Sequence, residues 1–350
     1  MRALTVEPGV PNSIELADMP PPPASDGDVL VRALALGICG TDREIIAGDY
    51  GAPPPGARRL ILGHESLGRV EEAPQGSGFG RGDLVVGIVR RPDPVPCAAC
   101  AIGEWDMCRN GLYTERGIKE RNGYGAEQFR IERDFAVKLD PSLGPLGPLG
   151  VLLEPASVVA KAWDQVERIG RRSRSWQPRV ALITGAGPVG LLAALLGAQR
   201  GLELHILDRN TRGPKPDLAR ALGASYYSGD LGKLAPDVVI ECTGAGEVVL
   251  DAMRRTAPQG IVCLAGVSSG GHKLKFDVGD LNRNMVLEND VVFGSVNANR
   301  RHYAAAAAAL AKADKDWLAR LITRKVPLSR WREAFEPRDD DVKVALDFTA

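Results

Sequence analysis

The second half of the chain alternates short apolar runs with longer amphipathic segments. Aliphatic residues dominate the runs at 179–184, 203–207, 237–241 and 260–266. Runs of this kind, without polar alternation, predict strands buried on both faces, as in a parallel sheet covered by helices. We therefore expect an α/β domain with a doubly wound parallel sheet at residues 176–301.

The first half of the chain has a different pattern. Residues 1 to about 90 show short strand-like runs separated by Gly and Pro residues, which predicts a compact β-rich domain. A helix is expected from about 153 to 169, and a strand at 342–348 is expected to rejoin the first domain. The β-rich domain is thus predicted to comprise residues 1–175 and 302–350.

Composition narrows the possible partners. The 350 residues include 44 Lys and Arg and 44 Asp and Glu, so the formal net charge is zero. This balance argues against nucleic acid or an anionic membrane surface as a partner. The sequence has no signal-like stretch and no membrane-spanning segment, so a soluble cytoplasmic protein is expected.

A group of side chains suited to metal binding lies near residue 40. Cys39, Thr41 and Asp42 provide a thiol, a hydroxyl and a carboxylate within four residues, and His64 and Glu65 follow. Zinc accepts sulfur, nitrogen and oxygen ligands, and a catalytic zinc keeps one coordination position open. The pattern predicts zinc bound by Cys39 and His64. The alternative is a buried Cys and a core His without a metal.

A glycine-rich turn follows the predicted strand at 179–184 and opens a helix. Glycines at its first, third and sixth positions allow the turn, the approach of a pyrophosphate and close packing of helix on strand. The next predicted strand ends in Asp208, where an acidic residue accepts the ribose hydroxyls of a dinucleotide. The predicted cofactor-binding residues of the turn are Gly185, Gly187, Pro188, Val189 and Gly190.

The choice between the two nicotinamide cofactors depends on the residues after the second strand. Asp208 would repel a 2′-phosphate and therefore favours NAD. Arg209 and Arg212 could pair with that phosphate, so NADP is possible as well. Thr243, which follows the strand at 237–241, is a further candidate for cofactor binding.

Four short motifs occur in a fixed order along the chain. They are GICGTD at 37–42, GHE at 63–65, GDLV at 82–85 and GYGAE at 123–127. With a nucleotide-binding half behind them, they resemble zinc-dependent medium-chain alcohol and polyol dehydrogenases over nearly the whole chain. The resemblance implies a GroES-like catalytic domain, a Rossmann cofactor domain, and a homodimer or homotetramer.

The resemblance also assigns roles around the metal. Glu154, predicted at the start of a helix, matches the carboxylate that polyol and glucose dehydrogenases use as third ligand, directly or through water. As a plain surface residue it would also be favourable there. Glu65 is expected to join the zinc when substrate or water shifts, and Asp42 to orient His64. Thr41 is the expected first member of a proton relay.

Three cysteines lie in a segment where the family often carries a structural zinc. Cys97, Cys100 and Cys108 match the last three of its four cysteines, whereas Pro94 stands at the first position. Pro94 cannot bind metal, but the adjacent Asp93 could donate an oxygen. Two interpretations stay open: a three-thiolate site completed by Asp93, and a lobe that has lost its metal. A third, three exposed thiols without a metal, is disfavoured because such cysteines would be open to oxidation.

The stretch around Glu115 resembles the glucose-oxidising branch of the family, in which a carboxylate receives hydrogen bonds from sugar hydroxyls. Asn297 resembles a sugar-contacting Asn of the same branch, and Thr41 and Glu154 complete the expected substrate contacts. Departures at Glu288, Val89 and Val158 leave the sugar open.

These features together predict oxidation of an aldose hydroxyl, at the anomeric carbon, with NAD or NADP and zinc. The alternatives are a polyol, cyclitol or alcohol dehydrogenase of the same fold, and a nucleotide-binding relative without catalysis.

Overall fold

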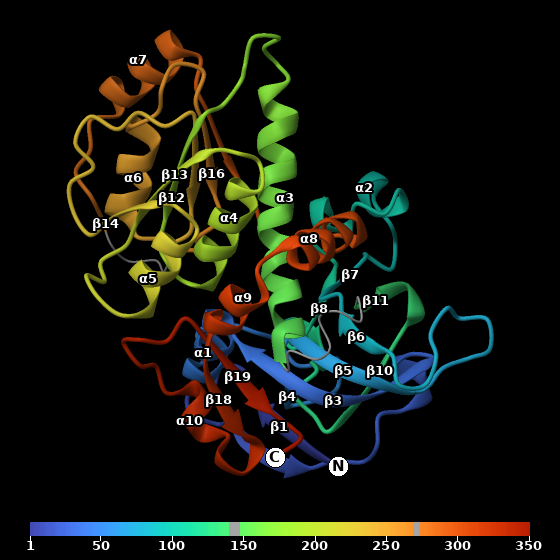
Figure 1. The fold of residues 1–350 in the computed structure, drawn as a ribbon. Coiled ribbons are helices and arrows are strands. Elements are labelled where there is room, and N and C mark those ends of the chain that lie inside the picture. The colour runs from blue at the N-terminus through green and yellow to red at the C-terminus, as the bar shows by residue number, and fades with distance from the viewer. Residues whose placement is uncertain (140–147, 269–272) are drawn as a thin grey trace. The chain divides into compact units, whose positions relative to one another are not determined.

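The computed structural model describes residues 1–139, 148–268 and 273–350 (Figure 1). His272, for which the sequence suggests no role, lies outside these residues. The described chain forms two compact units, one made of residues 1–157 and 297–350 and the other of residues 158–296.

The unit boundaries differ from the expected positions after residues 175 and 301. Helix α3, Leu153–Gly170, runs unbroken across the first boundary, so that its first residues belong to one unit and the rest to the other. Because backbone hydrogen bonds continue along the helix, the local sequence does not mark the boundary between the two units. Sequence reasoning, which looks for loops, places the boundary after the helix.

The described part of the unit at 158–296 is built on a six-stranded parallel sheet of order β14-β13-β12-β15-β16-β17. The strands are β12 Val180–Thr184, β13 Glu203–Leu207, β14 Ser225–Tyr227, β15 Val238–Glu241, β16 Ile261–Leu264 and β17 Val291–Gly294. This is the order of a doubly wound, Rossmann-type fold, which confirms the expected fold class.

Helices connect these strands (Figure 1). They are α4 Pro188–Ala198, α5 Pro214–Ala221, α6 Gly246–Arg254 and α7 Val278–Glu288. The sheet grows from β12 to β14 in one direction and from β15 to β17 in the other. Right-handed crossovers therefore put α4 and α5 on one face and α6 and α7 on the opposite face. Leu182, Val239 and Val262 pack with Ala252 of α6 in the buried core of this unit.

The described part of the unit at 1–157 and 297–350 is built mainly on antiparallel sheets. The largest has the order β11-β6-β5-β3-β19-β18, with β10 also paired to β3, and smaller sheets are β2-β1-β4 and β7-β8-β9. The bounds are β1 Arg2–Val6, β2 Glu15–Asp18, β3 Val29–Ile38, β4 Leu60–Ile61, β5 Glu65–Glu72, β6 Leu84–Gly87, β7 Arg90–Arg91, β8 Thr114–Arg116, β9 Glu120–Arg121, β10 Gln128–Ile131, β11 Ala136–Lys138, β18 Ile322–Pro327 and β19 Lys343–Asp347.

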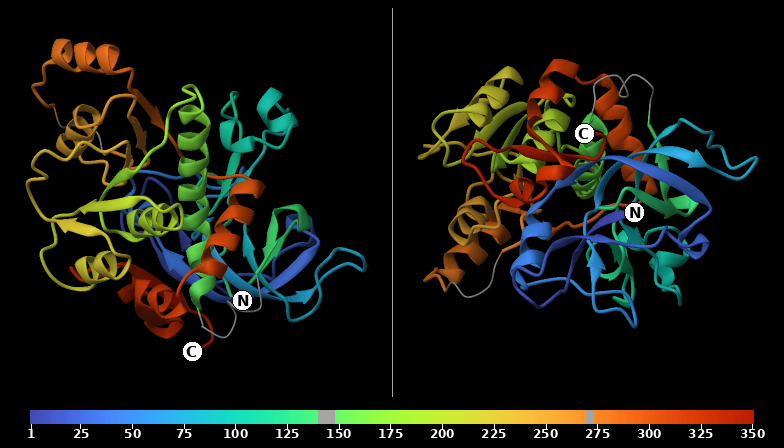
Figure 2. Two further views of the ribbon diagram at one scale, coloured as in Figure 1. Left: turned by 45° about the horizontal axis from the view of Figure 1, so that its top comes forward. Right: turned by 90° about the horizontal axis from the view of Figure 1, so that it is seen from below.

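Strand β3 lies between β5 and β19 in the largest sheet, as Figure 2 also shows for the blue and red strands. The expected return of the chain to the first domain at 342–348 is therefore confirmed. Helices accompany the sheets: α1 Gly40–Ala47, α2 Ala98–Ala101, α8 Arg300–Lys312, α9 Lys315–Leu321 and α10 Arg332–Phe335. The buried core draws on both ends of the chain, for example on Val31, Phe129 and Leu346.

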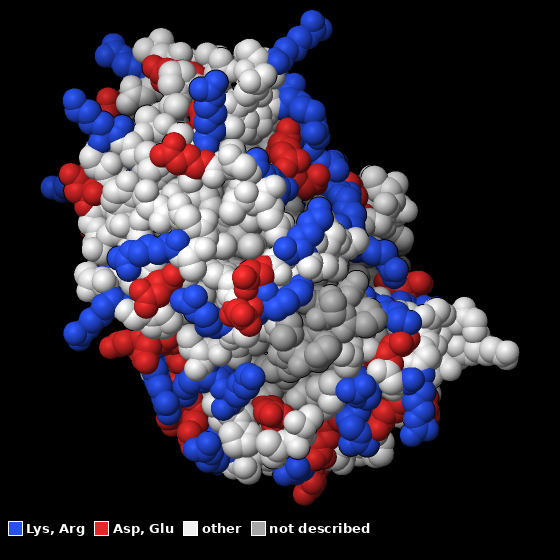
Figure 3. All heavy atoms as spheres, viewed as in Figure 1, with Lys and Arg blue, Asp and Glu red and all other residues white. Residues whose placement is uncertain are grey.

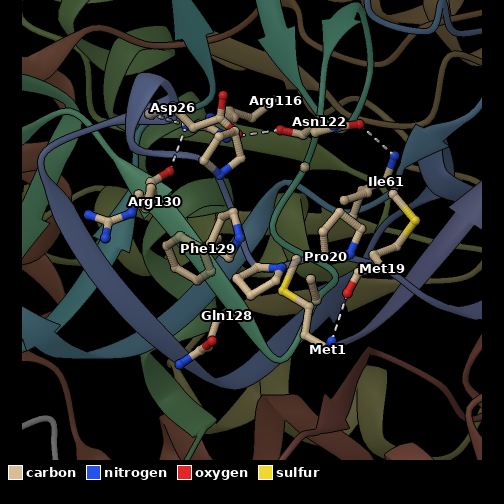
Figure 4. A pocket seen from close by; sticks show the side chains of 15 residues that line it. Met1, Met19, Pro20, Asp26, Ile61, Arg116, Asn122, Gln128, Phe129 and Arg130 are labelled. Carbon is tan, nitrogen blue, oxygen red and sulfur yellow. Dashed lines mark hydrogen bonds between the residues drawn. The ribbon is translucent and has the colours of Figure 1, made fainter. Parts of the chain in front are cut away.

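A hollow of about 190 Å³ lies in this unit beside β10 and the N-terminal residues (Figure 4). Its wall is mostly apolar and includes Met1, Met19, Pro20 and Phe129. The buried Arg116 guanidinium donates hydrogen bonds to the carbonyl oxygens of Asp26, Asn122 and Arg130. Arg116 thereby joins three segments of the chain that surround the hollow.

Acidic and basic side chains are interspersed over the face seen in Figure 3. Many of them pair, as Arg2 does with Glu127 and Arg32 with Glu71. Among the described residues, every helix is too short or too polar to cross a bilayer.

Two glycines of the same turn should respond differently to alanine. A Cβ atom at Gly190 would lie 1.8 Å from the carbonyl oxygen of Gly185, whereas one at Gly187 would meet nothing within 4 Å. Gly190→Ala should therefore lower the free energy of unfolding by roughly 1–3 kcal/mol, and Gly187→Ala, which only replaces the N-cap residue of α4 by a poorer one, should lower it by less. Thermal and urea unfolding of both variants would check this, and equal stabilities would contradict it.

Candidate active site

Cys39, His64 and Glu65 bring three metal-binding groups together. Their donor atoms, a sulfur, a ring nitrogen and a carboxylate oxygen, all lie within 4.8 Å of one another. His64 and Glu65 are buried, and Cys39 is half-buried. Cys39 precedes α1 directly and Glu65 is the first residue of β5, so the ends of two elements meet here. We call these three residues the Cys39 group.

Glu65 fits into this group because the residue opposite it is a glycine. Gly37 of β3 pairs with Glu65 of β5. A Cβ atom at position 37 would lie 2.0 Å from Oε2 of Glu65, which is far inside van der Waals contact. The missing side chain therefore provides the space that the carboxylate occupies.

Asp42, in the first turn of α1, contacts both Cys39 and His64. Its Oδ2 accepts a hydrogen bond from the Cys39 backbone N–H at 2.8 Å, and its Oδ1 lies 3.4 Å from Nδ1 of His64. With Nδ1 facing Asp42, Nε2 is the ring nitrogen available to a metal. Burial lowers the pKa of His64, but Asp42 and Cys39 outweigh burial and raise this pKa well above its ordinary value. The position thus favours a cation, whether proton or metal ion.

Lys343 belongs to this site, and sequence reasoning missed it. Its Nζ lies 2.6 Å from both carboxylate oxygens of Glu65 and 3.3 Å from the carbonyl oxygen of Ile38. Burial lowers the pKa of Lys343, but Glu65 and Cys39 raise it above its ordinary value. Lys343 and Glu65 are 278 residues apart, and Lys343 lies in an ordinary strand sequence. No local signal therefore links the two.

Glu154 and Thr41 lie at the starts of two helices. Glu154 is 8% exposed, so the surface interpretation is wrong for it. Burial raises the pKa of Glu154 to about 7, with His64 opposing the rise and Glu65 adding to it. Glu154 is thus close to the Cys39 group, although its carboxylate is not among the donors within 4.8 Å. Thr41 is half-buried, and its hydroxyl has no hydrogen-bond partner in the described part of the chain.

The site carries more acidic than basic side chains. The acids are Cys39, Asp42, Glu65 and Glu154, whereas positive charge comes from Lys343 and, when it holds a proton, from His64. Once His64 is neutral and Cys39 is deprotonated, as metal binding requires, the buried anions outnumber Lys343, so this donor set fits a divalent cation. Mixed sulfur, nitrogen and oxygen ligands suit zinc, whereas magnesium and calcium prefer oxygen alone.

Cys97, Cys100 and Cys108 form a second group, with their sulfur atoms within 4.8 Å of one another. The N–H groups of Arg109 and Cys100 point at the Cys97 sulfur and lower its pKa to about 6. Asp93, considered as a fourth ligand, is not among the donor atoms within 4.8 Å of one another. Its Oδ1 accepts a hydrogen bond from the Val95 N–H at 2.8 Å, whereas its buried Oδ2 has no hydrogen-bond partner among the described residues. The described residues thus bring three thiols together, with no fourth donor inside 4.8 Å.

Glu115 and Asn297, both expected at the substrate, are in direct contact. Oε1 of Glu115 accepts hydrogen bonds from Nδ2 of Asn297 at 2.8 Å and from Nε of Arg90 at 3.0 Å. Oε2 receives none from the described residues, so it remains available as an acceptor. Asn297 adopts a left-handed backbone with φ of 61°, a conformation that clusters at functional sites. Sequence reasoning missed Arg90, which lies 25 residues from Glu115 on the paired strand β7.

The glycine-rich turn joins β12 to α4, whose first turn contains Pro188 and Val189. Gly185 has a φ of 89°. Oδ2 of Asp208 accepts a hydrogen bond from the Ala186 N–H at 2.7 Å, so that Asp208 at the end of β13 faces the turn. The structure therefore brings the predicted strand-end acid and the glycine-rich turn together.

Thr243 is held beside this turn by Glu241, a residue that sequence reasoning missed. Glu241 is fully buried. Its Oε1 accepts hydrogen bonds from the Thr184 hydroxyl at 3.2 Å and from the Thr243 N–H at 2.7 Å, and the Thr243 hydroxyl also donates to it. Arg209 and Arg212 are exposed, and neither forms an ion pair within the described ranges.

Comparison with known proteins agrees with this architecture. Residues 25–141 match the alcohol dehydrogenase GroES-like domain, and residues 147–348 match the glucose dehydrogenase C-terminus. Glucose 1-dehydrogenase 2 of Vulcanisaeta moutnovskia is 38% identical, and glucose 1-dehydrogenase of Thermoproteus tenax is 40% identical, each over 99% of both chains. The Haloferax mediterranei glucose dehydrogenase structure with NADP, Zn and gluconolactone has a TM-score of 0.91 at 33% identity and covers 100% of both chains.

The fold and the site define a medium-chain dehydrogenase of the zinc-dependent type, with a GroES-like domain and a Rossmann cofactor domain. Within that class, the chain belongs to the glucose dehydrogenase family, because the family model covers residues 147–348 and full-length relatives reach 40% identity.

Replacing the glycine opposite Glu65 should disturb the Cys39 group. Gly37→Ala would push the Glu65 carboxylate out of the Cys39 group, so we expect a loss of roughly 1–3 kcal/mol in the free energy of unfolding, together with reduced metal content because a donor is displaced. Gly40→Ala is the matched control, because a Cβ atom there meets nothing within 4 Å. Elemental analysis and urea unfolding would test both variants. Wild-type values for Gly37→Ala would contradict this account of the site.

Proposed function

We propose that this protein oxidises an aldose at the anomeric carbon to the lactone, with NAD or NADP as hydride acceptor and zinc bound by Cys39, His64 and Glu154. The observation that carries the proposal is the Cys39 group, in which sulfur, nitrogen and oxygen donors lie within 4.8 Å in an acidic, buried site. The Haloferax relative, whose structure holds NADP, zinc and gluconolactone, supports the same chemistry.

The residues around the group have separate roles in this proposal. When bound, zinc supplies a Lewis acid that lowers the pKa of a hydroxyl bound to it. Asp42 keeps Nε2 of His64 turned toward the ion. Glu154, whose carboxylate is not among the donors within 4.8 Å, would hold the ion directly or through a water molecule.

Proton and hydride leave the sugar by different routes. The Thr41 hydroxyl has no hydrogen-bond partner among the described residues. It accepts the proton of the anomeric hydroxyl and passes it to water or to Glu65. The hydrogen on the anomeric carbon leaves with its electron pair for the nicotinamide ring. The sugar thereby loses two electrons and two hydrogens and becomes the lactone.

Sugar recognition is assigned to Glu115 and Asn297. Oε2 of Glu115 is the free acceptor for a sugar hydroxyl, because Arg90 and Asn297 both donate to Oε1. Arg90 and Glu115 side chains are each 6% exposed, so their charges compensate each other in a largely dry environment. The carboxylate is therefore held in one orientation before the sugar binds.

The arrangement at the nucleotide turn suits both cofactors. Asp208 can accept hydrogen bonds from ribose hydroxyls with its remaining lone pairs, which favours NAD. Arg209 and Arg212 are exposed and unpaired within the described ranges, so they are available to a 2′-phosphate of NADP. We propose dual use, with NAD preferred.

We also propose a homo-oligomer and a cytoplasmic location. Strand β17 is one of the two edges of the parallel sheet, and Val286 and Leu287 on α7 are 66% and 69% exposed. An edge strand and exposed aliphatic residues are typical of a surface that pairs with a second copy. All six cysteines are unpaired, and clustered thiols persist best in a reducing compartment. Light scattering would give the oligomer size.

The reaction is tested by following reduction of NAD and NADP with a panel of aldoses, polyols and alcohols. We expect turnover with glucose or a related aldose that a zinc chelator abolishes. Cys39→Ala should lose turnover and one equivalent of metal while still binding the dinucleotide. Replacement of the buried Cys263 of β16 by Ala is the matched control, and this variant should keep both turnover and metal. Activity confined to polyols or alcohols would refute the aldose assignment, and full turnover of Cys39→Ala would refute the zinc assignment.

The sugar contact is tested by Glu115→Gln. The amide keeps the shape but loses the charge, so the hydrogen bond to the sugar weakens and kcat/KM for the aldose should fall roughly tenfold to hundredfold. Glu120→Gln, an exposed carboxylate on the adjacent β9, should change nothing. Unchanged kcat/KM in Glu115→Gln would remove Glu115 from the substrate site.

A further inference from the structure

The Glu65 carboxylate faces two kinds of cation site. Nζ of Lys343 lies 2.6 Å from both of its oxygens. The carboxylate also belongs to the Cys39 group, within 4.8 Å of the Cys39 and His64 donor atoms. Both Glu65 and Lys343 side chains are 1% exposed. Solvent therefore cannot compensate either charge, and the two groups depend on each other.

All N–H donors of the Lys343 ammonium have acceptors, whereas the Glu65 carboxylate still has free acceptor sites. An ammonium has three N–H donors, and Lys343 directs them at the two Glu65 oxygens and the Ile38 carbonyl oxygen. A carboxylate has about four lone-pair sites, so each oxygen of Glu65 keeps one. Glu65 can thus bind a metal ion without leaving Lys343, but its negative charge is already shared.

We propose that Lys343 is a positioning residue that keeps Glu65 from becoming a permanent metal ligand and so preserves the open coordination position. The proposal rests on the proposed function, since it requires a metal ion at the Cys39 group. A catalytic zinc needs one position for substrate, and an unpaired buried carboxylate beside a divalent ion would fill it. The ammonium of Lys343 removes that tendency by sharing the charge of Glu65.

This role predicts an effect opposite in sign to structural damage. Without the ammonium, the metal ion is the cation nearest to Glu65, so Glu65 should bind it continuously and the ion should be held more tightly. A residue that only supported the fold would loosen the site when replaced. The rate at which zinc leaves the protein therefore separates the two cases.

The first test is zinc release from wild-type protein and from Lys343→Met, followed with a chromogenic chelator. We expect release from Lys343→Met to be slower by roughly tenfold or more, which is the usual size but the opposite sign of the change seen when partners of metal ligands are replaced, with kcat falling more than KM changes. Lys325→Met, an exposed lysine on β18, should match wild type. Release that is unchanged or faster in Lys343→Met would overturn the proposal.

The second test examines coordination directly. Cobalt(II) absorbs visible light strongly when four-coordinate and weakly when five-coordinate. Cobalt-loaded Lys343→Met should show the weaker bands, and Lys343→Arg, which restores the charge, should return the spectrum toward that of wild type. Identical spectra for wild type and Lys343→Met would overturn the proposal.

A double substitution keeps the test valid if Lys343→Met folds poorly. Glu65→Gln with Lys343→Met removes both charges together, so no unpaired ion is left in the core. In the Glu65→Gln background, replacing Lys343 should no longer slow zinc release, and a persistent effect would show that Lys343 does not act through Glu65. If wild-type protein holds no zinc at the Cys39 group, the proposed function itself is refuted. Failure of the proposed function is therefore distinguishable from failure of the Lys343 proposal.

Discussion

The pairing of strand β3 with β5 on one edge and with β19 on the other is the constraint on which the site depends. It puts Gly37 opposite Glu65 and Ile38 opposite Val344. Because side chains alternate between the faces of a strand, a slip of one residue in either pair would move Glu65 or Lys343 to the opposite face. The position of Glu65 in the metal-binding group, the space left by Gly37 and the positive charge of Lys343 thus follow from the register of one sheet.

The molecule holds two buried carboxylates in different ways. Glu241 receives its hydrogen bonds from Thr184, Thr243 and Gly244, so its lone pairs are occupied by neutral donors and it supports a fixed turn. Glu65 is balanced by an ammonium and keeps lone pairs free. Buried ion pairs contribute little to stability compared with an apolar replacement. The presence of one beside the Cys39 group is therefore explained better by chemistry than by folding.

Sequence reasoning found the elements that leave a local signal. The parallel sheet, the glycine-rich turn and the Cys39, His64 and Glu65 motifs each depend on residues close together in the chain, and the structure brings them together as expected.

The partners that sequence reasoning missed lie on neighbouring strands. Arg90 is 25 residues from Glu115 and Lys343 is 278 residues from Glu65, and strand register decides such pairs. The same limit explains why the unit boundary after residue 157 differs from the boundary expected after residue 175, because α3 continues through residue 157 without a change of local structure.

The order of the chain also has a consequence for synthesis on the ribosome. Residues 158–296 form a continuous segment with sheet contacts between nearby elements, so this unit can fold as soon as it emerges. The other unit must wait for β19, which pairs with β3 across nearly the whole chain. Until Lys343 has been made, Glu65 lacks its counter-ion and β3 has an open edge, which favours aggregation of unfinished chains. The nucleotide unit is therefore expected to fold first, and the last strand to be synthesised completes the metal site.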